Sequence, residues 1–93
     1  MFGVICAISV WSRETDSYTV NRRIVGPWET LKEAQEAIDK YITFTEENWN
    51  SKLDCRSEKT GNFLKLIEYD STVYGYGVEQ KYSFDICSVE KNF

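Results

Sequence analysis

Alternating apolar and polar positions predict two antiparallel hairpins, one in each half of the chain. Residues 2–11 and 18–25 form the first hairpin, because only a short polar segment separates them. Residues 62–69 and 81–90 form the second, and residues 73–78 between them fit either a bulged strand or the tip of a hairpin. The predicted strand at residues 2–11 is apolar on both faces, which is typical of a central strand.

Between the hairpins, residues 30–49 predict one amphipathic helix. Its apolar residues recur three or four positions apart, and they are Leu31, Ala34, Ala37, Ile38, Tyr41, Ile42 and Trp49. Thr30 and Glu33 predict a capping box, in which the Thr hydroxyl accepts a hydrogen bond from a backbone N–H and the Glu reaches back. The β-branched residues within 42–45 lower helix propensity, so the helix is expected either to break there or to run on to about Asn50.

The resulting order ββαββ predicts an α+β fold with two layers, in which one amphipathic helix covers one face of an antiparallel four-stranded sheet. Gly26 and Pro27 are expected to end the second strand, and the polar residues 51–62 are expected to form a mobile loop. With 93 residues, the chain is predicted to be a single domain, residues 1–93. The sheet face without a helix is left to solvent or to a partner.

Charge changes the interpretation of the helix. The net charge of −4 lies entirely within residues 29–47, which hold six acids and two bases, while the rest of the chain is neutral. The acids are Glu29, Glu33, Glu36, Asp39, Glu46 and Glu47. Lys32, Glu36 and Lys40 have the i, i+4 spacing of exposed ion pairs. Such a cluster is either a solvated helix face or a surface that binds a basic partner.

Aromatic residues supply further candidates for contact with a partner. Tyr74 and Tyr76 alternate with glycine, and Tyr is enriched at interface hot spots because it offers contact area at low entropic cost. Trp28 lies near a strand end, where it either caps the core or anchors a partner. For all three rings, packing within the fold is the alternative to partner binding.

Several kinds of chemistry are disfavoured by what the chain lacks. It contains no His, which removes Ser-His-Asp and Cys-His catalysis and most catalytic zinc sites. Gly75 and Gly77 form a G-x-G without the third glycine and the following helix of a phosphate-binding loop. Cys6 and Cys87 are expected as small core residues, and Cys55 as a thiol in the polar segment with no base nearby. We therefore predict no catalytic residue, no metal site, no cofactor and no enzymatic activity.

Cysteine usage and hydropathy bear on the location of the protein. Three widely spaced cysteines argue against a disulfide framework and for a reducing compartment. Residues 1–10 are apolar but have no basic segment, so they predict a buried strand and not a secretion signal. No apolar run reaches the ~18 residues of a membrane span. The expected location is cytoplasmic, with no membrane partner.

Residues 26–34, Gly-Pro-Trp-Glu-Thr-Leu-Lys-Glu-Ala, resemble a pattern found in small phage and mobile-element proteins. In that pattern a strand ends in Gly-Pro-aromatic, and a helix opens with Ser or Thr, two residues, and Glu-Ala. In size and acidity the chain is also similar to the non-enzymatic anti-CRISPR proteins of phages. The resemblance implies an inhibitor in the host cytoplasm that covers the basic surface of a nucleic-acid-handling host defence protein.

Two other classes of function stay open at this point. Arg22 and Arg23, on a strand with Tyr18, fit a nucleic-acid-binding module that stacks bases on aromatic rings, although the net acidity argues against nucleic acid. The uncovered sheet face or an edge strand fits a self-associating structural protein, for which the simplest form is a homodimer.

Overall fold

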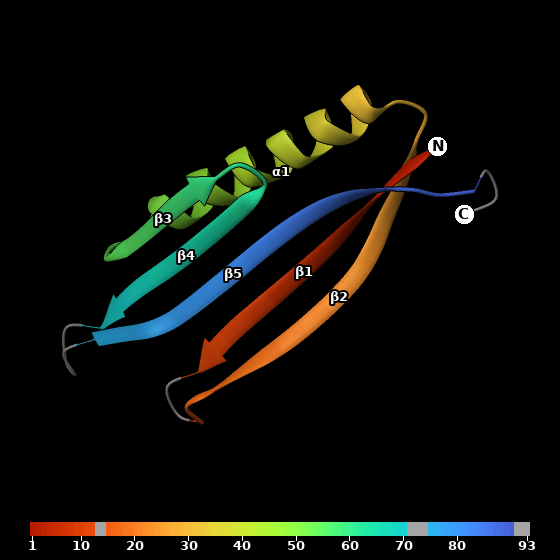
Figure 1. Ribbon diagram of the computed structural model, residues 1–93. Coiled ribbons are helices and arrows are strands. Elements are labelled where there is room, and N and C mark those ends of the chain that lie inside the picture. Colours follow the sequence, from red (N-terminus) through yellow and green to blue (C-terminus); the bar gives the residue numbers. More distant parts are fainter. Residues whose placement is uncertain (13–14, 71–74, 91–93) are drawn as a thin grey trace.

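Five strands and one helix make up the computed structural model, which describes residues 1–12, 15–70 and 75–90, without the side chains of 12, 70 and 75–78 (Figure 1). The elements are β1 (Phe2–Ser12), β2 (Ser17–Trp28), α1 (Leu31–Asn50), β3 (Cys55–Thr60), β4 (Phe63–Asp70) and β5 (Gly75–Ser88). The strands form one antiparallel sheet in the order β2-β1-β5-β4-β3, and α1 lies against one of its faces (Figure 1). The α+β class is therefore confirmed.

The prediction of four strands in the order ββαββ is wrong, because the polar segment after the helix contains β3. Residues Cys55–Thr60 pair along their whole length with β4, and a tight turn containing Gly61 at φ 57° joins the two strands. At the outer edge of the sheet, most β3 side chains face water, so the strand has no apolar alternation to reveal it. The expected loop over residues 51–62 is correspondingly short.

Gly26 and Pro27 do not end the second strand as expected. β2 continues through a cis Gly26–Pro27 bond to Trp28, and a register shift opposite Gly3 accommodates an extra residue. Proline is tolerated here because β2 is an edge strand, where a missing N–H costs no ladder hydrogen bond. This extension carries Trp28 back over the sheet to the start of the helix.

The helix forms as predicted at its N-terminus and is continuous to Asn50. Thr30 is the N-cap, and its hydroxyl oxygen accepts from the Glu33 backbone N–H at 3.1 Å. The Glu33 carboxylate accepts from the same hydroxyl at 3.2 Å, a variant of the expected capping box. No break occurs at residues 42–45, because Ile42 is fully buried and Trp49 donates its indole N–H to the Ile67 carbonyl at 3.1 Å.

The core lies between α1 and the middle of the sheet. Its buried members are Val4, Cys6, Ala34, Ile38, Ile42, Leu64, Leu66 and Phe84. The even-numbered residues of β1 face the helix, so the odd-numbered ones lie on the opposite, open face of the sheet. The helix leaves β2 largely uncovered, and the β2 side chains before Trp28 are all exposed.

Candidate functional site

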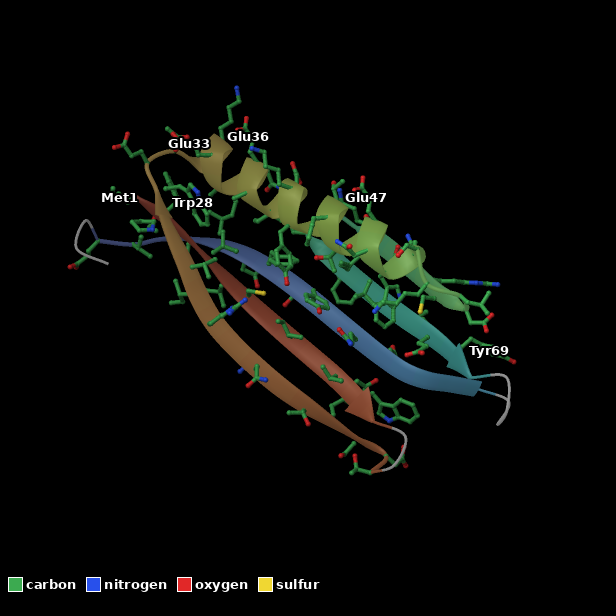
Figure 2. The ribbon with its side chains drawn as sticks, turned by 180° about the vertical axis from the view of Figure 1, so that it is seen from behind. Met1, Trp28, Glu33, Glu36, Glu47 and Tyr69 are labelled. Atoms are coloured by element: carbon green, nitrogen blue, oxygen red, sulfur yellow. The ribbon has the colours of Figure 1, made fainter. Side chains whose placement is uncertain are left out.

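The outer side of α1 collects most of the carboxylates that the sequence singles out. Glu29, just before the helix, and Glu33, Glu36, Asp39 and Glu47 are all exposed. Figure 2 shows Glu33, Glu36 and Glu47 along the side of α1 that points away from the sheet. We call the five residues the acidic face.

Glu46 does not belong to the acidic face. Its side chain is half-buried and accepts a hydrogen bond from the Ser57 hydroxyl at 2.9 Å, and Asn50 donates to the same hydroxyl at 2.8 Å. Glu46 therefore helps to hold β3 against the helix. Its helical position turns it about 100° away from Glu47, which is why two adjacent acids have different roles.

The carboxylates of the acidic face have no ion-pair partners among the residues that the structure describes. The expected pairs of Glu36 with Lys32 and Lys40 do not form, and the ion pairs found join Glu79 to Lys65 at 3.3 Å and to Lys81 at 3.6 Å. These pairs lie in the sheet, away from α1. No ion pair in the described part of the chain therefore neutralises a carboxylate of the acidic face.

Phe44 is the functional candidate that the sequence analysis missed. Its ring is 67% exposed and lies beside a shallow hollow of about 320 Å³ that Asp39, Lys40, Thr43 and Glu47 also line. The available signal is its position: residue 44 falls off the stripe of apolar residues that faces the sheet. A ring displayed among charged side chains has no role in the core of this fold.

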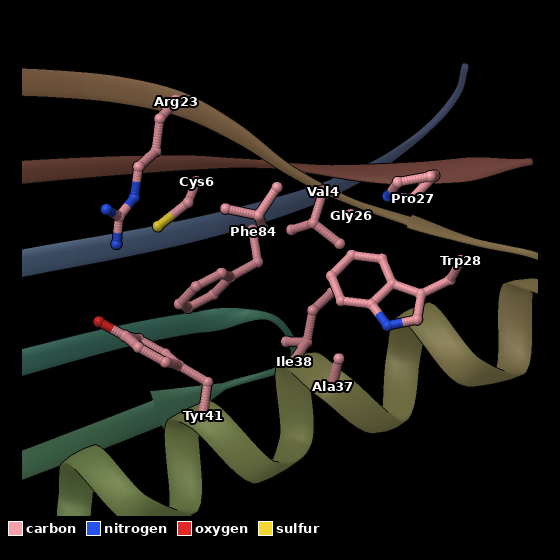
Figure 3. Close-up of a pocket in the computed structure, with 11 residues that line it drawn as sticks. Val4, Cys6, Arg23, Gly26, Pro27, Trp28, Ala37, Ile38, Tyr41 and Phe84 are labelled. Atoms are coloured by element: carbon pink, nitrogen blue, oxygen red, sulfur yellow. The ribbon is translucent and has the colours of Figure 1, made fainter. Parts of the chain in front are cut away.

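Trp28 lies elsewhere, in a cleft between the first half of α1 and strands β1 and β2 (Figure 3). The cleft has a volume of about 370 Å³. Its lining residues are Val4, Cys6, Arg23, Val25, Gly26, Pro27, Trp28, Ala37, Ile38, Tyr41 and Phe84. Trp28 is half-buried and packs against the core, so capping of the core explains its position without a partner.

One end of the cleft is polar. In Figure 3 the guanidinium of Arg23, the thiol of Cys6 and the hydroxyl of Tyr41 lie at the end remote from Trp28. Burial raises the pKa of the Cys6 thiol, and the nearby Arg23 charge offsets only part of this effect. The thiol is therefore neutral at neutral pH, and Arg23 is the charged group at this end.

Arg22 and Arg23 point to opposite faces of β2. Arg23 lies opposite Cys6, on the sheet face that α1 covers. Arg22 lies opposite Ala7 on the open face. Tyr18, opposite Trp11, is also on the open face. On that face the Lys81 ammonium lies 5.3 Å from the Tyr18 ring centroid. The geometry does not unite the two arginines in one platform for stacked bases.

The tyrosines and cysteines that remain from the sequence analysis do not form a functional site within the described residues. Tyr74 lies outside the described residues, and Tyr76 lies in β5 without a described side chain. Burial is the first cause that raises the pKa of the Cys55 thiol, which disfavours the nucleophilic thiolate. Cys87 donates to the Gly3 carbonyl at 3.6 Å. Within the described residues no His, Cys, Asp or Glu side chains cluster as metal ligands, and no helix is long and apolar enough to cross a membrane.

Comparison of the chain with protein-family models, with curated proteins and with solved structures finds no match in any of the three.

Proposed function

We propose that the protein is a non-enzymatic protein-binding module, and that its acidic face binds a basic surface of a partner protein. One observation carries the proposal: the 67% exposed ring of Phe44 lies beside helix carboxylates that form no ion pair in the described part of the chain. An aromatic anchor within a polar rim is the usual anatomy of an interface hot spot. The carboxylates would steer a basic partner toward the helix, and the ring would be buried on contact.

We further propose that the partner is a nucleic-acid-handling protein and that binding inhibits it, as in the anti-CRISPR proteins that the sequence resembles. Proteins that bind nucleic acid expose lysines and arginines spaced to neutralise phosphates. A rigid helix with carboxylates over several turns offers the same partner a competing array of negative charge. The phage or mobile-element origin of the protein is part of this proposal.

Affinity capture with mass spectrometry tests the binding. The wild-type chain, Phe44→Ser and the double variant Glu36→Lys/Glu47→Lys are immobilised and exposed to host lysate at about 50 mM and about 500 mM salt. The Debye length falls from about 14 Å to about 4 Å between these conditions, so an electrostatically steered partner is expected only at the lower salt. Both variants are expected to lose it.

Asp85→Lys is the matched control. Asp85 is an exposed carboxylate in β5, opposite Ile5 on the open face, so its reversal makes away from α1 the same change in net charge as each of the two helix substitutions makes on it. This control is expected to retain the partner. The proposal is contradicted if no partner is recovered at low salt, or if Asp85→Lys loses the partner as fully as Glu36→Lys/Glu47→Lys does.

Competition tests the finer proposal once the partner is in hand. An oligonucleotide that the partner binds is expected to displace the wild-type chain, and the chain is expected to displace the oligonucleotide in turn. A ternary complex of partner, oligonucleotide and chain would overturn inhibition by charge mimicry and leave protein binding intact.

A further inference from the structure

The cleft between α1 and β2 has the make-up of a small-molecule site. Side chains in its middle are short, since Val4, Cys6 and Ala37 leave space that larger residues would fill. Aromatic rings of Trp28 and Phe84 provide broad apolar walls. Its volume of about 370 Å³ lies within the range of ligand pockets, roughly 300–1,000 Å³.

The charge of the residues that line the cleft favours an anionic ligand. Arg23 is the charged residue among the described residues that line it, and no acidic side chain lines it. Arg23 also has no ion-pair partner in the described part of the chain. The Tyr41 hydroxyl at the same end offers a second donor, and the neighbouring Cys6 is neutral. A planar guanidinium is suited to a carboxylate, which it can bind through two parallel hydrogen bonds.

We propose that this cleft binds a small amphipathic carboxylate, with the carboxylate on Arg23 and Tyr41 and the apolar body between Trp28 and Phe84. The site is separate from the acidic face and does not depend on the function proposed for it. At about 30 Å³ per water molecule, 370 Å³ corresponds to about 12 waters, so ligands of roughly ten non-hydrogen atoms fit. The apolar body is either a medium-length alkyl chain or a short chain ending in a phenyl ring.

Titration followed by ¹H–¹⁵N NMR tests the site with named probes. Octanoate and 4-phenylbutyrate are the aliphatic and aromatic carboxylates, and octanamide is the neutral isostere of octanoate. We expect at least one carboxylate to bind with a dissociation constant on the order of 0.1 mM. Shifts are expected in the backbone amides of residues 23–26, 28 and 37–41 and in the Trp28 indole N–H, but not in the Trp11 indole on the open face.

Two arginine variants separate recognition of the carboxylate from simple apolar binding. Arg23→Gln is expected to weaken carboxylate binding roughly tenfold or more, because a charge-assisted hydrogen bond is lost, and to leave octanamide unaffected. Arg22→Gln, the adjacent residue on the opposite face of β2, makes the same change in net charge and is expected to bind as wild type. Both arginines are exposed, so neither variant endangers the fold.

Three results would overturn the proposal. Equal affinities of octanamide and octanoate for the wild type would show an apolar cleft without carboxylate recognition. An equal loss of affinity in the two arginine variants would show a net-charge effect and no site. Absence of shifts from every probe at about 5 mM, some fifty times the expected dissociation constant, would show that the cleft takes no such ligand.

Discussion

At the scale of single residues, α1 contains two large apolar side chains two positions apart with opposite environments. Ile42 is fully buried in the core, whereas Phe44 is 67% exposed. In the sequence, both lie in residues 42–45, where β-branched residues lower helix propensity. In the structure the two side chains differ in role: Ile42 stabilises the fold from within the core, whereas the Phe44 ring does not pack in the core.

Paired alanine substitutions test this separation. Ile42→Ala is expected to lower the free energy of unfolding by about 3–4 kcal/mol, because it removes buried methyl groups and leaves a cavity. Phe44→Ala is expected to change it by less than about 0.5 kcal/mol, as for most surface substitutions. Urea denaturation followed by circular dichroism measures both. A loss of several kcal/mol in Phe44→Ala would assign the ring to stability and weaken the case for the acidic face.

At the scale of secondary structure, prediction succeeded where a local signal and a tertiary contact agree. The N-terminus of α1 carries its own cap in Thr30, so the sequence locates it to the residue. The C-terminal half has weak intrinsic propensity and is held by Trp49 and by Glu46 with Ser57, contacts across 18 and 11 residues. Such contacts do not appear in the periodicity of the sequence, which therefore does not determine where the helix ends.

Strand prediction failed for a related physical reason. β1 and β4 bury alternate side chains and show it in sequence, whereas β3 gains its order from backbone pairing with β4 and from Ser57. The cleft could not be predicted from the sequence either, because Arg23 and Tyr41 come to line it together only when α1 packs on the sheet face to which Arg23 of β2 points. The acidic face was predictable, since charge and helical spacing are local, except for Glu46 and Phe44.

The hydrogen bond from Trp49 gives a test at this scale. Trp49→Phe keeps a ring in place but removes the donor to the Ile67 carbonyl, and is expected to cost about 1 kcal/mol and to speed amide exchange over residues 45–50. Lys52→Ala, which removes the ammonium 5.2 Å from the Trp49 ring centroid together with its alkyl chain but leaves the indole donor in place, is the control. It is expected to have the smaller effect on exchange. Equal exchange rates in Trp49→Phe and wild type would show that packing alone holds the helix end.

At the scale of the whole molecule, one helix on five long strands gives a flat, extended body. The principal extents are 50 × 26 × 17 Å, and the Cα radius of gyration is 15.2 Å, against about 12 Å for a compact domain of this length. The accessible surface is 6468 Å², whereas a monomer of 10.9 kDa usually exposes about 5,600 Å². The excess of negative charge lies along α1, whereas the charged residues of β2 are Arg22 and Arg23.

The charged residues of the sheet lead us to expect that the chain is a monomer in solution. Stacking two open faces would desolvate the Glu79 carboxylate and the two lysines paired with it, which is costly. Pairing two β2 edges in the antiparallel register centred on residues 22–23 would bring Arg22 and Arg23 of both copies together. We expect sedimentation equilibrium to give a mass near 10.9 kDa and small-angle scattering to give a radius of gyration close to 15 Å. A doubled mass that persists at high salt would contradict the expectation of a monomer. Apolar contact would then outweigh both charge penalties, and self-association would become the better explanation of the open face.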